Sequence, residues 1–136
     1  TSQLNVDTIV DKAGSGGTNI KVGNTATYVG DGGSGTQNTV QSLVKFWMQA
    51  DLSSMSYDDS FNASSATDTA TGQMTSAFTN NFSNASYSIT GASNSGDAGV
   101  YNGAQATNQW RTYMRNESNA DTDASFGGYM IAGDLA

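Results

Sequence analysis

The sequence predicts an all-β fold: an antiparallel, jelly-roll-like β-sandwich domain that carries a short N-terminal β arm. Several short stretches alternate apolar and polar residues with a period of two, as a half-buried strand requires. Ser, Thr and Asn make up about a third of the chain, Gly occurs 16 times, and Pro is absent. Short hydroxyl and amide side chains suit turns and exposed strand faces, so the composition favours strands over helices.

The first 35 residues contain three strand-like pieces separated by glycines. Residues 4–10 alternate and predict a first strand, and residues 19–22 and 26–29 predict two shorter ones. Residues 30–35 combine Gly, Ser and Asp and predict a flexible linker. This linker also matches the G-x-G-x-x-G pattern, but the segment after it alternates as a strand. No dinucleotide cofactor is therefore expected.

We expect two parts: an N-terminal arm or attachment segment over 1–35 and the β-sandwich over 36–136. The arm has too few apolar residues for a core of its own. We expect it to become ordered only against a neighbouring subunit or a larger assembly. The residues assigned to this attachment are Leu4, Val6, Ile9 and Val10.

The best alternation in the second part runs from Val44 to Leu52. It places Val44, Phe46, Met48, Ala50 and Leu52 on one face and Lys45, Trp47, Gln49 and Asp51 on the other. Further strands are expected near residues 57–63, 72–79, 85–92, 108–116 and 127–133, with a surface loop over 94–107. Short strands at this spacing are typical of a sandwich.

The supply of core residues is small for a chain of this length. Leu, Ile, Val and Phe together number 20 of 136, so Ala, Met, Trp and Tyr must provide much of the packing. Burial against copies of the same chain is a second source of packing. An ordered chain with so small a core favours an oligomer.

The charge excludes several kinds of partner. The net charge is −7, and only five residues are Lys or Arg, too few to neutralise the phosphates of a nucleic acid. The same scarcity disfavours an anionic membrane surface. Because no apolar run approaches 18 residues and no export signal is visible, membrane insertion is not expected either.

Catalytic chemistry is not expected, because the chain has neither His nor Cys. The same absence excludes zinc sites with nitrogen and sulfur ligands. A carboxylate pair could still hydrolyse glycosides, and the acidic residues available for it are Asp58, Asp59, Glu117, Asp121 and Asp123. Asp58 and Asp59 are adjacent, so a regular strand would point them to opposite faces.

Residues 119–125 place oxygen-bearing side chains at alternate positions, as calcium loops do. The Gly and the terminal Glu of an EF-hand are missing. A polar loop is the favoured interpretation, and a weak calcium site near Asp121 and Asp123 is left open.

Aromatic and cationic side chains could form an exposed contact patch, because these residue types are enriched where proteins bind partners. The candidates for a receptor or subunit contact are Trp47, Tyr101, Tyr113, Arg111 and Arg115. The alternative is that the aromatic residues pack between subunits or under loops while the arginines pair with nearby aspartates.

Four short motifs occur in an order that resembles the C-terminal domains of bacteriophage tail fibres, especially those of marine phages. They are Lys45-Phe46-Trp47-Met48, the segment from Ser60 to Asp68, the segment from Met74 to Phe82, and Asn84-Ala85-Ser86-Tyr87-Ser88-Ile89. The resemblance covers roughly residues 40–136. It implies a virion surface protein, made in the cytoplasm of a bacterial host, whose arm attaches to other virion proteins. The symmetry usual in such fibres, together with the small core, leads us to expect a homotrimer.

Two functions fit this resemblance. The first is a fibre-tip-like module that attaches a virion to a glycan or protein on the host surface. The second is a capsid decoration or head-fibre subunit that serves assembly and stability. We expect the first, because the resemblance is to a domain type found mainly on fibres, and we do not expect an enzyme.

Overall fold

The computed structural model describes residues 22, 26–29, 33–95 and 101–135, and the chain divides into two compact units between Ser42 and Leu43. The expected strand over 4–10 lies outside the described residues, as do Leu4, Val6, Ile9 and Val10. The division falls after Ser42 instead of after residue 35, because residues 36–38 pair with a strand of the first unit.

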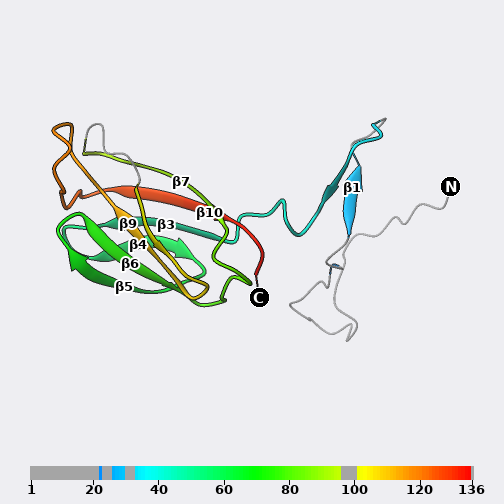
Figure 1. The fold of residues 1–136 in the computed structure, drawn as a ribbon, viewed down its shortest axis with the longest axis horizontal. Helices are drawn as coiled ribbons and strands as arrows, with labels where there is room; N and C mark the ends of the chain where they lie inside the picture. Colours follow the sequence, from blue (N-terminus) through cyan, green and yellow to red (C-terminus); the bar gives the residue numbers. More distant parts are fainter. Residues whose placement is uncertain (1–21, 23–25, 30–32, 96–100, 136) are drawn as a thin grey trace. The chain divides into compact units, whose positions relative to one another are not determined.

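The described part of the first unit is a small antiparallel hairpin. It consists of β1 (Thr27–Val29) and β2 (Thr36–Asn38), drawn in blue and cyan in Figure 1. The Tyr28 hydroxyl donates a hydrogen bond of 2.7 Å to Gln37 Oε1 across the hairpin. The side chains of Tyr28 and Val29 are nevertheless exposed, so the described part of this unit does not bury its apolar residues.

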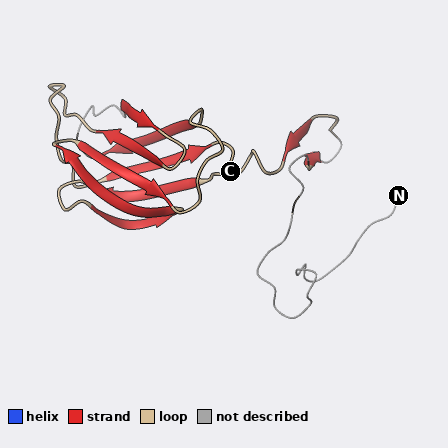
Figure 2. Ribbon diagram, turned by 60° about the horizontal axis from the view of Figure 1, so that its bottom comes forward, coloured by secondary structure: helices blue, strands red, loops and turns tan. Residues whose placement is uncertain are grey.

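The second unit is a sandwich of two four-stranded antiparallel sheets (Figure 1). The first sheet has the order β4-β3-β10-β7, and the second has the order β5-β6-β9-β8. The strands are β3 (Phe46–Asp51), β4 (Ser56–Phe61), β5 (Ala63–Ala70), β6 (Gln73–Phe78), β7 (Ser88–Ser93), β8 (Tyr101–Gln105), β9 (Gln109–Tyr113) and β10 (Gly127–Ala132). The described residues contain strands and loops but no helix (Figure 2).

The expected antiparallel β-sandwich is therefore confirmed. Three hairpins lie within a sheet, formed by β3–β4, β5–β6 and β8–β9, while the other connections cross between the sheets. Only some pairs of successive strands therefore lie in opposite sheets, and the jelly-roll connectivity is not confirmed.

Alternate side chains of the central strands fill the space between the sheets. Phe46, Met48, Ala50 and Leu52, which were expected on one face, are all buried. Val44 was expected on the same face, but it precedes β3 and is exposed. Trp110 and Met114 are buried from the other sheet. The core is rich in aromatic rings: Phe46 packs edge-on against Phe78 at 5.3 Å between ring centroids, a favoured aromatic geometry.

Three strands were not foreseen, namely β2 in the first unit and β5 and β8 in the sandwich. The stretch that becomes β5 reads Ala-Ser-Ser-Ala-Thr-Asp-Thr-Ala and has almost no apolar alternation, because most of this edge strand is exposed on the outside of its sheet. The predicted loop over 94–107 is wrong in its second half, where β8 forms the opposite edge of the same sheet. Edge strands keep few buried contacts, so period-two patterning marks them weakly.

Candidate binding surface

The outer face of the first sheet carries a continuous row of large side chains. Phe46 and Met48 point into the core, so Trp47 between them points outward. The strand register sets Trp47 directly opposite Phe61 of β4 on one side and Met130 of β10 on the other. Thr90 of β7 continues the same row beyond Met130.

These apolar side chains are unusually accessible. Phe61 is 52% exposed, Met130 is 48% exposed and Trp47 is 36% exposed. Phe126 precedes β10 and is also exposed; its ring would lie 3.5 Å from a Cβ atom added at Gly128. Contiguous exposed apolar surface marks interaction sites, whereas single exposed residues need no explanation.

A hollow of about 500 Å³ lies beside this row. The next row of outward positions reads Asp59, Gln49, Gly128 and Ala92 across the four strands. Gly128 has no side chain and Ala92 has only a methyl group, so the sheet surface here is recessed relative to the neighbouring row of large side chains. The outward residues that line the hollow are Trp47, Gln49, Thr90, Ala92, Gly128 and Met130. Its volume is within the usual range for small-ligand sites.

The hollow contains few polar groups and no charge. Gln49 brings an amide and Thr90 a hydroxyl, and none of the six lining residues is ionisable. Gln49 Nε2 donates a long hydrogen bond of 3.3 Å to Asp58 Oδ2 on β4. A mainly apolar concavity with a few convergent polar groups is the usual character of a binding site.

The outer face of the second sheet differs in character. Its outward positions on β6 and β9 are mainly polar, namely Gln73, Thr75, Ala77, Gln109, Arg111 and Tyr113. Arg111 Nε donates a hydrogen bond of 3.3 Å to Thr75 Oγ1 of the neighbouring strand. The exposed apolar side chains therefore gather on one of the two faces of the sandwich.

The structure separates the residues of the expected contact patch. Trp47 lies on the first sheet, whereas Arg111 and Tyr113 lie on the outer face of the second. Tyr101 is in β8 with its backbone opposite Tyr113, and its side chain is outside the described part. Only Trp47 belongs to the hollow, and its partners there, Met130 and Gly128, were not among the candidates.

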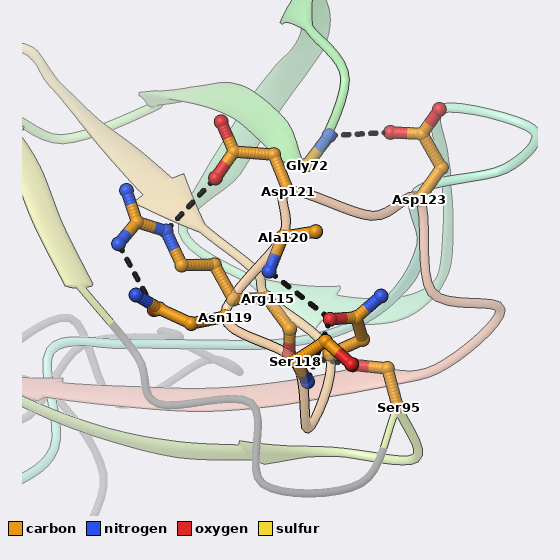
Figure 3. A network of polar contacts seen from close by, with 9 residues as sticks. Gly72, Ser95, Arg115, Ser118, Asn119, Ala120, Asp121 and Asp123 are labelled. Carbon is orange, nitrogen blue, oxygen red and sulfur yellow. Dashed lines mark hydrogen bonds and ion pairs between the residues drawn. The ribbon is translucent and has the colours of Figure 1, made fainter.

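Arg115 belongs to a loop network at one end of the sandwich (Figure 3). Its Nε lies 2.8 Å from Asp121 Oδ1, and its Nη1 donates to Asn119 Oδ1 at 3.2 Å. The alternative interpretation of this arginine, pairing with a nearby aspartate, is the one the structure shows. Both partners are partly exposed, so the pair adds little to stability.

The carboxylates of the candidate calcium loop are engaged with protein donors. Asp121 accepts from Arg115, and Asp123 Oδ1 accepts from the backbone N–H of Gly72 at 2.6 Å (Figure 3). Within the described residues, no three acidic side chains gather in a way that could hold a metal ion. The loop is built to join strands.

The carboxylates of β4 are arranged differently from the expectation. A β-bulge opposite Gln49 and Ala50 makes Asp58 an extra residue, because Gln49 pairs with Asp59 and Ala50 with Tyr57. Asp59 lies opposite the outward-pointing Gln49, and Asp58 accepts a hydrogen bond from the Gln49 amide, so the alternation expected of a regular strand does not hold at the bulge. They lie beside the hollow and give its margin a negative charge.

The core behind the hollow contains polar atoms without hydrogen-bond partners in the described structure: Trp110 Nε1, Thr112 Oγ1 and the Tyr129 hydroxyl. Burial raises the pKa of Tyr129 to about 12. Burial likewise raises the pKa of Tyr87 to about 12. Both tyrosines are therefore neutral structural residues at ordinary pH.

These shifts predict a loss of stability in alkali. An unfolded tyrosine ionises near pH 10, so each buried tyrosine contributes fully below pH 10 and loses its contribution between about pH 10 and 12. We expect the free energy of unfolding to fall by up to about 1.4 kcal/mol per pH unit for each tyrosine. Urea denaturation of the wild type and of Tyr129→Phe at several pH values measures this change. The free energy of unfolding of the variant should fall less steeply with pH. Equal slopes in the two proteins would contradict the prediction.

Comparisons with protein-family models, with curated proteins and with solved structures found no match for the chain. Within the described part of the chain, no helix is long and apolar enough to span a membrane. The function proposed below therefore rests on the sequence motifs and on the geometry of the sandwich.

Proposed function

We propose that the chain is a phage virion surface protein and that its sandwich is a fibre-tip-like module for attachment to a host surface. The observation that carries this proposal is the apolar, hollowed outer face of the first sheet, with Trp47 and Met130 beside the glycine floor. The resemblance of the sequence motifs to tail-fibre domains supports the same function.

The sandwich is suited to hold such a surface in a fixed shape. Trp47 and Met130 lie on the two central strands of their sheet, each hydrogen-bonded on both sides. The neighbouring inward residues, among them Met48 and Tyr129, are almost fully buried. A site on rigid strands keeps its geometry before a ligand arrives, which limits the entropy lost on binding.

Binding without catalysis is part of the proposal. Within the described residues, acidic side chains form no cluster for a metal, and Asp121 and Asp123 accept hydrogen bonds from the Arg115 side chain and the Gly72 backbone. The hollow itself presents an amide and a hydroxyl and no ionisable group. Such groups can orient a ligand, but they are poor general acids and bases.

The first unit offers exposed apolar side chains for attaching the module to other subunits. Val22, Tyr28 and Val29 are exposed there, whereas the second unit buries a core of its own. We propose that these residues are covered by copies of the chain in a homotrimer or by other virion proteins. An exposed apolar hairpin of this kind also suits a capsid decoration or head-fibre subunit, which is the second candidate function.

Competition for adsorption tests the attachment function. Purified full-length chain is expected to occupy the host receptor and to reduce adsorption of the phage that encodes it. Trp47→Ala should lose this inhibition, because it removes the largest exposed side chain of the hollow. Tyr113→Ala, on the outer face of the other sheet, is the matched control and should inhibit like the wild type. If no concentration of the wild-type chain reduces adsorption, the attachment function is wrong and the decoration role is favoured.

A further inference from the structure

We propose that the hollow on the outer face of the first sheet binds an uncharged saccharide, a glycan built from neutral hexoses. This inference rests on the proposed attachment function and names the chemical class of its ligand. Shape, polar groups and charge at the hollow each support it.

The shape fits sugar rings lying across the strands. Neighbouring strands are about 4.8 Å apart, a spacing close to the repeat of a pyranose ring along an extended glycan. Phe61, Trp47 and Met130 occupy the same row on three adjacent strands. A pyranose presents an apolar C–H face that can stack on the indole ring of Trp47, while the low floor at Gly128 leaves room for a neighbouring ring.

The polar groups are of the kind that sugar hydroxyls need. A hydroxyl both donates and accepts, and the Gln49 amide and the Thr90 hydroxyl can each do both. These two residues lie on β3 and β7, on either side of β10. Among the described residues, the Gln49 side chain makes one hydrogen bond, the long one to Asp58, so a ligand hydroxyl can replace that contact without a large loss.

Charge selects a neutral ligand. The six lining residues carry no charge, but Asp58 and Asp59 lie at the margin and the whole chain has a net charge of −7. An acidic glycan would be repelled by this field. A cationic ligand would be attracted to the margin, but no carboxylate lines the hollow itself to pair with it. The same charges disfavour a second copy as the occupant, because a two-fold contact of this face with itself would bring two sets of aspartates together.

The two tryptophans of the chain make binding directly observable. Trp47 is 36% exposed at the hollow, whereas Trp110 is fully buried between the sheets. Quenching of fluorescence by acrylamide should therefore report on Trp47 alone. A saccharide stacked on the indole ring should shift its emission and reduce its access to the quencher.

The test uses the full-length chain on an array of oligosaccharides, with neutral gluco-, galacto- and manno-oligosaccharides beside alginate and hyaluronate oligosaccharides as acidic controls. Neutral members that bind are then titrated by fluorescence and calorimetry. We expect neutral glycans to bind, the acidic ones not to bind, and acrylamide quenching to fall as the hollow fills.

Three variants locate the site. Trp47→Ala is expected to weaken binding by at least about tenfold, the loss typical of a central aromatic contact. Gly128→Val should weaken it similarly by filling the floor; a Cβ atom there meets nothing closer than 3.5 Å, so the fold should tolerate the change. Tyr113→Ala should bind like the wild type. Circular dichroism confirms that each variant is folded.

Several outcomes would overturn the assignment: binding of acidic glycans alone, no binding of any neutral glycan at millimolar concentration, or equal binding by Trp47→Ala. A lower mass of Trp47→Ala in light scattering would instead make this face a subunit contact. If adsorption is blocked but no neutral glycan binds, the attachment function stands and the ligand class is wrong. If neutral glycans bind but adsorption is not blocked, the saccharide site stands and the attachment function is wrong.

Discussion

Replacing Gly72 with alanine is expected to destabilise the sandwich more than any change on its surface. Gly72 lies in the two-residue turn between β5 and β6 with a φ of +70°, a conformation that costs an L-residue about 1–2 kcal/mol. An added Cβ atom would also lie 2.5 Å from the carbonyl oxygen of Met114 and 2.8 Å from the backbone nitrogen of Thr122. Neither backbone atom can move without disturbing the loop that it belongs to.

The loss of stability should be large because Gly72 is hydrogen-bonded to the 114–123 loop. Its N–H donates to Asp123, and its carbonyl oxygen accepts from the backbone N–H of Met114 at 2.7 Å. Strain and overpacking together are expected to cost on the order of 3 kcal/mol. For a domain of this size, such a loss lowers the melting temperature by roughly 10–20 °C.

Gly128→Ala is the matched control for this prediction. The added Cβ atom would be 3.5 Å from the Phe126 ring, an ordinary contact, and no strained φ is involved. Calorimetry of both variants should show a small change for Gly128→Ala and a large one for Gly72→Ala. Similar melting temperatures for the two proteins would show that the contacts of Gly72 do not hold the loop.

Replacing Asn62 with alanine is expected to cost about 3–5 kcal/mol of stability, since it strips a buried corner of its hydrogen bonds. Asn62 lies where the chain passes from β4 in one sheet to β5 in the other, with a φ of 63°. Its Nδ2 donates to the carbonyl oxygens of Lys45 and Asn80, both at 3.0 Å, and its Oδ1 accepts from the Asn80 N–H at 2.6 Å. Alanine leaves all three backbone groups without this partner.

Two further substitutions divide that cost into its parts. Asn62→Gly removes the strain of a positive φ but keeps the loss of hydrogen bonds, so it should be less damaging than alanine. Asn62→Asp would place a carboxylate oxygen about 3.0 Å from the carbonyl oxygens of Lys45 and Asn80, so it should be at least as damaging as alanine. Asn119→Ala is the control, because Asn119 has a φ of 59° but is exposed. If Asn62→Ala and Asn119→Ala had similar melting temperatures, the hydrogen bonds of Asn62 would not be stabilising the passage from β4 to β5.

The central strands could be predicted because burial on one face imposes a pattern on them. Phe46, Met48 and Ala50 alternate with exposed residues because β3 lies between two other strands with the second sheet beneath it. The edge strands β5 and β8 lacked this signal. The bulge at Asp58 was also hidden, since an extra residue shifts the alternation of β4 without leaving any mark in composition.

The candidate site could be predicted only in part. Trp47 stood out as an aromatic residue on the polar face of an alternating strand. Met130 alternates with Tyr129 and Ile131, and nothing in the sequence tells which set faces water. Gly128 gave no signal, because its effect, a low floor beside Trp47, depends on the register of three strands that are distant in sequence.

The central claim is that this chain is displayed where a phage contacts its host. Immunogold labelling of intact particles, with antibodies raised against the full-length chain, tests that claim most directly. The account predicts gold at the distal ends of tail fibres, with labelling reduced when particles are first bound to host cells. Gold distributed over the capsid shell, unaffected by host cells, would contradict it and identify the chain as a decoration subunit.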